Sequence, residues 1–152
     1  MFRGITAVNI DTKGRLAIPT KYREGLHASD EGKMVLTIDT ETKCLLLYPL
    51  SQWQIIEEKL QQLPSFNPQA RRIQRLLIGH ATDIDIDSAG RILVPQILRD
   101  YAVIEKKVML VGQGKKFELW SEAQWLSARE IWLVEEANKG DALPEELMTL
   151  SL

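Results

Sequence analysis

The sequence predicts an α+β protein, mainly β, whose two halves are copies of one unit related by a pseudo-two-fold axis. Residues 11–19 return as residues 87–95, and both copies read Asp-x-x-Gly-Arg followed by an apolar residue, any residue, an apolar residue and proline. A looser similarity follows each motif, because residues 45–53 resemble residues 117–125. Two copies are too few for a solenoid, and one copy alone would expose its strand edges. We therefore expect two halves that complete each other.

Each copy is predicted to fold as strand, strand, short helix, strand and strand. Apolar alternation predicts two strands around a tight turn within residues 4–18, and the proline that ends each motif suits the start of a helix. Short apolar runs predict the remaining strands. After the first turn we expect a helix at 20–26 and strands at 34–38 and 44–48, and after the second a helix at 96–102 and strands at 108–111 and 117–120.

Helical patterns connect the two copies and also follow the second one. Ser51 with Gln54 fits a capping box ahead of an apolar stripe, and Ser121 with Gln124 repeats that pattern before a last helix. A second connecting helix is expected at 68–77. The predicted organisation is a first half at 5–52, a helical connector at 53–80, a second half at 81–124, and a C-terminal helix with an acidic tail at 125–152.

The repeated motif has the chemistry of a tight turn that presents an arginine. An aspartate side chain accepts hydrogen bonds from amides two residues further on, and glycine supplies a positive φ without a steric clash. An ion pair between aspartate and arginine would fix the direction of the guanidinium, although an exposed pair adds little stability. The loop-orienting residues are Asp11 and Gly14, which precede Arg15, and Asp87 and Gly90, which precede Arg91.

Two arginine-bearing turns in the same frame favour binding to a repeating anion, of which duplex DNA is the obvious example. Arginine forks match phosphates and guanine edges, and β-elements enter the grooves of DNA. The simpler interpretation is that each aspartate–arginine pair only braces its own turn. Two arginines also give weak, salt-sensitive binding, so useful affinity would need several copies acting together.

The distribution of charge permits such a partner although the net charge is −2. From residue 121 to residue 152, seven acidic residues face only Arg129 and Lys139, so the rest of the chain is net positive. The first 26 residues hold five basic side chains against two acidic ones. Because polyanion binding depends on local potential, basic residues of this segment join the DNA-facing candidates, namely Arg3, Lys21 and Arg23.

Other chemistries have little support. The single cysteine, Cys44, lies in an apolar run and is expected to be a small buried hydrophobe in a reducing cytoplasm. His27 and His80 lack companions at the spacing of a zinc site. The longest apolar runs are too short for a membrane span. We therefore expect no catalytic residue, metal, cofactor, small-molecule substrate or membrane partner.

Residues 83–87 alternate aspartate with isoleucine, which places three carboxylates on one strand face. The run resembles a calcium loop only superficially. Counted from Asp83, such a loop has Ser88 where glycine is required and Val94 where glutamate is required. A solvated strand face is the simpler interpretation, and an acid–base pair is the alternative.

The two Asp-x-x-Gly-Arg turns occur together with the start MFRG and with the segment QRLLIGHA at residues 74–81. In these features the sequence resembles the MraZ family over nearly the whole chain. Each half is similar to the AbrB-type swapped-hairpin domain. The resemblance implies duplicated AbrB-like halves that form one pseudo-two-fold small β-barrel, with flanking and C-terminal helices.

The resemblance also implies a function. The chain would be a transcriptional regulator, usually a repressor of its own operon in the cell-division and cell-wall gene cluster, and would bind short G-rich direct repeats as a ring homo-oligomer at the nucleoid. By the family's Asp-x-x-x-Arg motif, Arg15 and Arg91 would face the DNA and the motif aspartates would orient them. Lys13 lies in the first turn where the second has Ala89, which favours the first half as base reader.

Three other functions remain open on the sequence alone. An antitoxin-like module would use its tail to neutralise a toxin, although such modules usually dimerise through one copy. A barrel enzyme would use the face of Asp83, Asp85 and Asp87. A purely structural ring would recruit partners through its acidic C-terminal helix and would not bind DNA.

Overall fold

The computed structural model describes residues 1–140 and 143–150. The first copy and the connector contain, in order, β1 (Phe2–Asn9), β2 (Arg15–Ala17), α1 (Thr20–Asp30), β3 (Lys33–Ile38), β4 (Leu45–Pro49), α2 (Leu50–Gln61) and α3 (Pro68–Leu77). The second copy and the C-terminal region contain β5 (Thr82–Asp85), β6 (Arg91–Leu93), α4 (Gln96–Tyr101), β7 (Lys107–Gly114), β8 (Phe117–Ser121), α5 (Glu122–Ala137) and α6 (Glu145–Met148). The order strand, strand, helix, strand, strand therefore occurs twice. Asp141, part of the predicted acidic tail, lies outside the described residues.

The strands interleave the two copies. One antiparallel sheet has the order β1-β7-β8-β4-β3-β5, and β2 pairs with β6 in a separate two-stranded ribbon. The hairpins β3–β4 and β7–β8 join strands of the same copy. The pairs β1–β7, β2–β6, β3–β5 and β4–β8 join strands of different copies. The predicted combination of helices with antiparallel strands is confirmed, and each copy covers strand edges of the other.

The six-stranded sheet is open within the described residues, so the small barrel that the family resemblance implies is not confirmed. β1 and β5 lie at its two edges, and no strand in the described part of the chain pairs with their outer sides. Beyond β1 the chain turns into the ribbon, with an isolated bridge between Ile10 and Leu16 at the start of the turn. β2 and β6 pair with each other in the ribbon and are not strands of the six-stranded sheet.

The main core connects the ribbon to the sheet and takes equivalent residues from both copies. Leu16 and Ile92 lie opposite each other in the ribbon, and Ile18 and Val94 follow them; each of the four is at most 1% exposed. Full burial of such side chains is worth about 1.5–3 kcal/mol each. The ribbon, and with it the two motif turns, is thus anchored to the body from both copies.

Helices α1 and α4 follow the motif prolines, as predicted, but α1 is longer than expected. Pro19 and Pro95 occupy the N-cap positions immediately before the helices. α1 continues to Asp30 and ends at Glu31, which adopts the left-handed conformation. The predicted end at residue 26 was therefore four residues too early.

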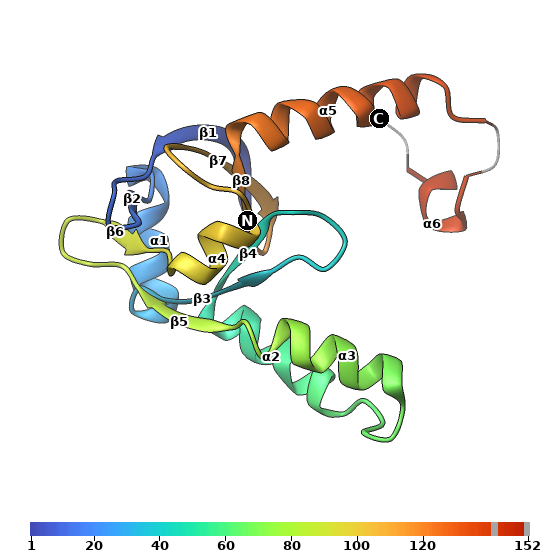
Figure 1. The fold of residues 1–152 in the computed structure, drawn as a ribbon, viewed down its shortest axis with the longest axis horizontal. Coiled ribbons are helices and arrows are strands. Elements are labelled where there is room, and N and C mark those ends of the chain that lie inside the picture. The colour runs from blue at the N-terminus through green and yellow to red at the C-terminus, as the bar shows by residue number, and fades with distance from the viewer. Residues whose placement is uncertain (141–142, 151–152) are drawn as a thin grey trace.

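α2 and α3 form a helical hairpin that extends from the sheet (Figure 1). A second apolar cluster holds its base, where Trp53 and Leu60 of α2 pack with Val35 of β3. The hydroxyl of Thr37 also donates a hydrogen bond to the carbonyl of Leu77 at 2.7 Å. The hairpin is therefore attached to the sheet through both of its helices.

The capping box predicted at Ser51 is wrong. α2 begins at Leu50 with Pro49 in the N-cap position, so Ser51 lies inside the helix. The amide of Ser51 donates instead to the carboxylate of Asp30, at 2.8 Å. A carboxylate at the end of α1 thus satisfies a free amide in the first turn of α2, a contact that no local pattern reveals.

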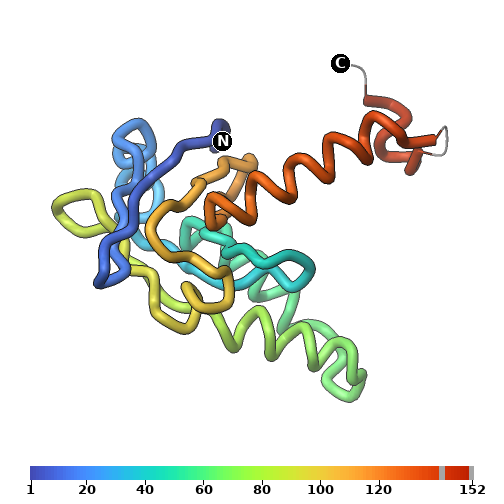
Figure 2. The backbone as a smooth tube through the Cα atoms, turned by 45° about the horizontal axis from the view of Figure 1, so that its top comes forward, coloured from blue at the N-terminus to red at the C-terminus, as the bar shows by residue number. Residues whose placement is uncertain are grey.

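α5 begins at the predicted Ser121 cap, whose hydroxyl accepts a hydrogen bond from the amide of Gln124 at 3.1 Å. Trp125 and Trp132 pack edge to face on Trp120 of β8, with ring centroids 5.7 and 5.6 Å away. Beyond this contact α5 extends away from the body, as does the α2–α3 hairpin, and both point away from the ribbon (Figure 2). No helix in the described ranges is long and apolar enough to span a membrane.

Candidate nucleic-acid interface

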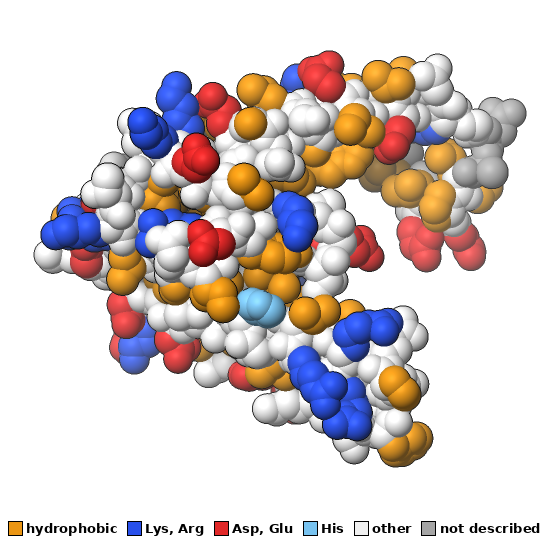
Figure 3. All heavy atoms as spheres, in the orientation of Figure 1, with side chains coloured by type: hydrophobic (Ala, Val, Ile, Leu, Met, Phe, Trp, Pro, Cys, Tyr) orange, Lys and Arg blue, Asp and Glu red, His pale blue; other side chains and the backbone are white. Residues whose placement is uncertain are grey.

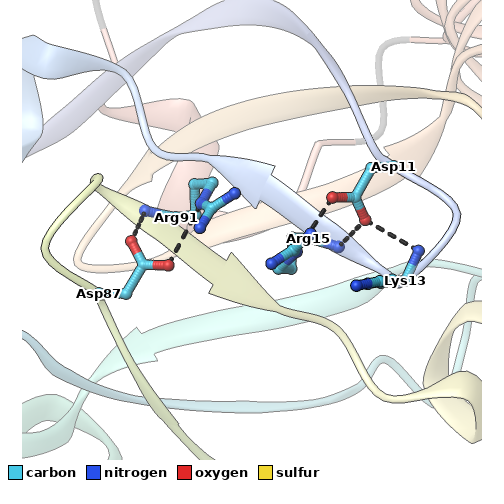
Figure 4. Close-up of polar contacts among 5 residues, drawn as sticks. All are labelled: Asp11, Lys13, Arg15, Asp87 and Arg91. Carbon is cyan, nitrogen blue, oxygen red and sulfur yellow. Dashed lines mark hydrogen bonds and ion pairs between the residues drawn. The ribbon is translucent and has the colours of Figure 1, made fainter.

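The first motif forms a turn that is organised around one carboxylate (Figure 4). Oδ1 of Asp11 accepts hydrogen bonds from the amides of Lys13 and Arg15, both at 2.9 Å. Oδ2 of Asp11 accepts from Nε of Arg15 at 3.0 Å, and the amide of Gly14 donates to the Asp11 carbonyl at 3.0 Å. The predicted turn and its ion pair are therefore present.

The second motif repeats this geometry bond for bond. Oδ1 of Asp87 accepts from the amides of Ala89 and Arg91, both at 2.9 Å, and Oδ2 accepts from Nε of Arg91 at 3.2 Å. The amide of Gly90 donates to the Asp87 carbonyl at 2.9 Å. In both turns, the Nε atom of the arginine is therefore held by the aspartate of the same motif.

The ribbon places the two arginines on one face. Leu16 lies opposite Ile92 and both are buried, so the neighbouring residues of each strand face the other way. Arg15 lies opposite Leu93, and Arg91 lies opposite Ala17. The two arginines are thus diagonal neighbours on the outer face, within reach of one ligand. Figure 4 shows both side chains between the two aspartates.

Each motif turn is bonded to the other copy. The carbonyl of Gly14 accepts a hydrogen bond from the amide of Val94 at 2.7 Å, and the carbonyl of Gly90 accepts from the amide of Ile18 at 2.8 Å. Both glycines are buried and have positive φ, +90° and +77°. The ribbon and its two turns form one unit to which both copies contribute equally.

The hydrogen bonds of the turns favour charged aspartates, which hold the arginines in place. The amide of Arg15 holds the pKa of Asp11 below its usual 3.8, and the amide of Arg91 does the same to the pKa of Asp87. Hydrogen bonds to a carboxylate stabilise its charged form. Because both pairs are exposed, their effect on stability is small, and their main consequence is to orient the guanidinium groups.

The other predicted DNA-facing residues lie on the first motif turn or on neighbouring elements outside the ribbon. Lys13 is exposed on the first turn, next to Arg15 (Figure 4). Arg3 and Lys21 are exposed and meet at Tyr22, whose hydroxyl donates to the Arg3 carbonyl at 2.5 Å and whose ring lies 4.9 Å from the Lys21 ammonium. Arg3 lies in β1 and Lys21 lies in α1, so neither is part of the ribbon.

Arg23 is half-buried and donates from Nε to the carbonyl of Ile18 at 2.7 Å. Its counterpart Arg99 donates from Nε to the carbonyl of Val94 at 3.0 Å. Sequence reasoning placed Arg23 among the DNA-facing residues and assigned no role to Arg99. The signal that points to Arg99 is present in the sequence, because a basic residue lies four positions after each motif proline.

The remaining candidates do not join the interface. Asp83 and Asp85 are exposed while Ile84 is buried, which is the solvated strand face expected from the alternation. Cys44 is buried, and burial raises the pKa of its thiol to about 12, so it behaves as the small hydrophobe predicted. Asp39 and Glu118 lie near that thiol, and Glu118 accepts a hydrogen bond from the Trp120 indole at 3.0 Å.

The fold and site define a class of small, internally repeated proteins of helices and antiparallel strands that present two arginine turns on one exposed ribbon. A family model described as "MraZ protein, putative antitoxin-like" matches residues 1–76 and 77–131. Proteins named transcriptional regulator MraZ from Legionella pneumophila (strain Corby), Coxiella burnetii (strain Dugway 5J108-111) and Alkalilimnicola ehrlichii are 63%, 59% and 54% identical over 152 residues, covering 100% of both chains. The chain belongs to the MraZ family.

Proposed function

We propose that this protein is a sequence-specific DNA-binding transcriptional regulator that reads duplex DNA with Arg15 and Arg91. The observation that carries the proposal is the pair of aspartate-oriented guanidinium groups on one exposed face of a two-stranded ribbon. The name of its relatives, transcriptional regulator MraZ, supports the same conclusion. A simple bracing role explains the ion pairs but not why both copies direct their arginines to the same face.

The ribbon suits a DNA groove. The major groove admits a two-stranded β-ribbon, and the commonest specific contact there is an arginine fork on the O6 and N7 atoms of guanine. Nε of each arginine donates to the aspartate of its own turn. Within residues 1–140 and 143–150, the Nη atoms of Arg15 and Arg91 form no hydrogen bond. The Nη edge is therefore the one we propose meets a guanine or a phosphate, which agrees with a preference for G-rich sites.

The first turn is proposed to contribute more than the second. Lys13 adds a cation beside Arg15, whereas the equivalent Ala89 adds none. The strand before the second turn also carries exposed Asp83 and Asp85, which repel phosphate. Arg3 in β1 and Lys21 in α1 belong to the first copy and would strengthen the contact with the DNA backbone.

We infer that the halves, residues 5–52 and 81–124, are a duplicated swapped-hairpin unit. The inference is supported by the pairing of β1 with β7 and of β5 with β3, in which each copy inserts its first strand beside a hairpin of the other. In this arrangement the ribbon takes one strand from each half. One chain thereby carries a two-turn interface that would otherwise need a dimer.

We further propose that the protein assembles into a ring and represses its own operon, in the cell-division and cell-wall cluster, by binding direct repeats at the nucleoid. Assembly is supported by apolar residues of α5 that are at least 50% exposed, namely Leu126, Ile131, Leu133 and Val134. The charges of the two extensions also support assembly. Exposed Arg71, Arg72 and Arg75 lie on the α2–α3 hairpin, and exposed acidic side chains lie on α5 and α6 (Figure 3). Subunits related by rotation face the same way, which matches direct repeats.

A gel-shift comparison tests the function. Duplexes from the region upstream of the gene, containing one or three repeats, are titrated with the wild type and with Arg15→Ala. The wild type is expected to bind three repeats at least about tenfold more tightly than one, because linked contacts act together. Equal affinity for one and three repeats would refute the ring on direct repeats, and unchanged binding by R15A would refute the arginine assignment.

A further inference from the structure

Two arginines outside the motif, Arg23 of α1 and Arg99 of α4, occupy equivalent positions beneath the ribbon. Arg23 donates from Nε to the carbonyl of Ile18, and Arg99 donates from Nε to the carbonyl of Val94. Both side chains are half-buried. Each arginine therefore holds the residue that directly precedes its own motif proline.

The same two residues are bonded to the opposite copy. The amide of Ile18 donates to the carbonyl of Gly90, and the amide of Val94 donates to the carbonyl of Gly14. A continuous chain of hydrogen bonds thus runs from Arg23 through residue 18 to the second turn. Its counterpart runs from Arg99 through residue 94 to the first turn.

The guanidinium groups also pack directly on these glycines. A methyl group placed on Gly90 would collide with the guanidinium of Arg23. A methyl group placed on Gly14 would lie 2.9 Å from Cζ of Arg99 and 2.7 Å from the Val94 carbonyl oxygen. Each arginine is therefore linked to the turn of the other copy in two ways. It is hydrogen-bonded to a residue, 18 or 94, that bonds that turn, and it packs directly on the glycine of the turn.

We propose that Arg23 and Arg99 are positioning residues that act across the repeat: Arg23 fixes the turn that presents Arg91, and Arg99 fixes the turn that presents Arg15. The proposal rests on the proposed DNA-binding function for its consequence. A side chain that is held in its bound geometry by a supporting shell loses less entropy on binding. Each half of the chain thus sets the affinity of the other half's arginine.

A double-mutant cycle on DNA affinity tests the crossed assignment. Arg23→Lys keeps the charge but loses the planar fork that holds the Ile18 carbonyl. R23K is expected to weaken binding about tenfold in the wild type and in the R15A background, which corresponds to about 1.4 kcal/mol. In the R91A background it should have little further effect, because the side chain it positions is absent.

Arg99→Lys is the matched control, with the coupling reversed. R99K should weaken binding in the R91A background and have little further effect in R15A. Equal losses in both backgrounds would show that these arginines contact DNA directly or act on the fold as a whole, and would overturn the proposal. Coupling of each lysine variant to the arginine of its own copy would overturn it as well.

Hydrogen–deuterium exchange of the free protein separates this inference from the function. R23K should speed exchange of the amides at residues 89–91 and leave those at 13–15 unchanged, and R99K should do the reverse. If R15A and R91A leave DNA binding intact, the proposed function fails while the crossed exchange pattern still decides the positioning. If neither R23K nor R99K folds, or if each variant speeds exchange in both motif turns, these arginines contribute to general stability. Either result would contradict the proposal.

Discussion

At the residue scale, the proposed DNA contact depends on how the two guanidinium groups of Arg15 and Arg91 are oriented. Asp11 and Asp87 each use one carboxylate oxygen for backbone amides and the other for Nε of an arginine. Because the carboxylate is fixed by the turn, the arginine inherits its direction from the backbone. An exposed ion pair of little energetic value can thus have a large effect on binding.

Arg15→Ala is expected to reduce the free energy of DNA binding by about 1–3 kcal/mol, and Arg91→Ala by less, because only the first turn carries Lys13. Fluorescence anisotropy on an upstream duplex measures both losses. Arg129→Ala is the control, because Arg129 is also an exposed, ion-paired arginine but lies on α5, 3.3 Å from Glu130. A larger loss for R91A than for R15A would contradict the proposed bias toward the first half.

The lowered pKa values of Asp11 and Asp87 predict a pH dependence of stability. When the folded pKa is depressed, the stabilisation is complete above the unfolded value of 3.8 and is lost as pH falls through the folded value. The double variant D11N/D87N should therefore show a flatter fall in the free energy of unfolding below about pH 4. Urea unfolding at a series of acidic pH values measures this, and parallel curves for wild type and variant would contradict it.

At the element scale, the ribbon consists of one strand from each copy, so neither copy can form it alone. β2 and β6 are short, and each is held by a partner strand, by a buried leucine or isoleucine, and by a turn bonded to the other copy. A two-stranded element is marginal by itself, so these attachments give it the rigidity of the core. Precision of the two arginines follows from that anchoring.

Gly14→Ala and Gly90→Ala are expected to destabilise the protein by about 1–3 kcal/mol each, because both positions have positive φ and no room for a methyl group. Gly25→Ala is the matched control. A methyl group on Gly25 in α1 meets no atom within 4 Å, so this change should stabilise by about 0.5–1 kcal/mol. Thermal unfolding of the three variants measures the difference; similar melting temperatures for G14A and G25A would be inconsistent with the turn geometry.

Local features of this fold were predictable from the sequence, because they depend on neighbouring residues. The motif turns follow from aspartate and glycine chemistry, and the Ser121 cap follows from its own sequence pattern. The missed features are nonlocal. Asp30 accepts the amide of Ser51, whose own hydroxyl was expected to cap α2, and β2 pairs with β6 of the other copy in a separate ribbon.

The candidate site divides in the same way. Arg15, Arg91 and Lys13 could be assigned because they belong to the repeated turn itself. The role of Arg99 could not, since its contact with Gly14 exists only when the two copies are folded together. The repeat of a basic residue at positions 23 and 99 indicates that this position has a role in both copies. Only the interleaved fold shows that each arginine contacts the turn of the other copy.

At the scale of the whole molecule, the ribbon occupies one end and two helical arms extend away from it (Figure 1). The arms carry the exposed apolar and charged surfaces that we propose hold neighbouring subunits together. The proposed DNA-binding and assembly surfaces therefore lie on different parts of the molecule, and substitutions should separate the two functions.

The double variant Leu126→Glu/Leu133→Glu on α5 is expected to reduce the mass of the assembly. Both leucines are exposed, and the two introduced glutamates would place charges in the proposed subunit contact. Its affinity for a three-repeat duplex should fall to that for a single repeat, with single-repeat binding unchanged. Light scattering and anisotropy measure the two effects. An assembly of wild-type mass would show that this face of α5 is not a subunit contact.

We propose that the two aspartate-oriented arginines on the ribbon bind duplex DNA. The most direct test compares the wild type with the double variant R15A/R91A on a duplex from the protein's own upstream region, over a series of salt concentrations. We expect the variant to keep the wild-type melting temperature within a few degrees, to lose at least about 100-fold in affinity, and to show a salt slope smaller by about 2. A folded double variant that binds with wild-type affinity and salt slope would contradict the account.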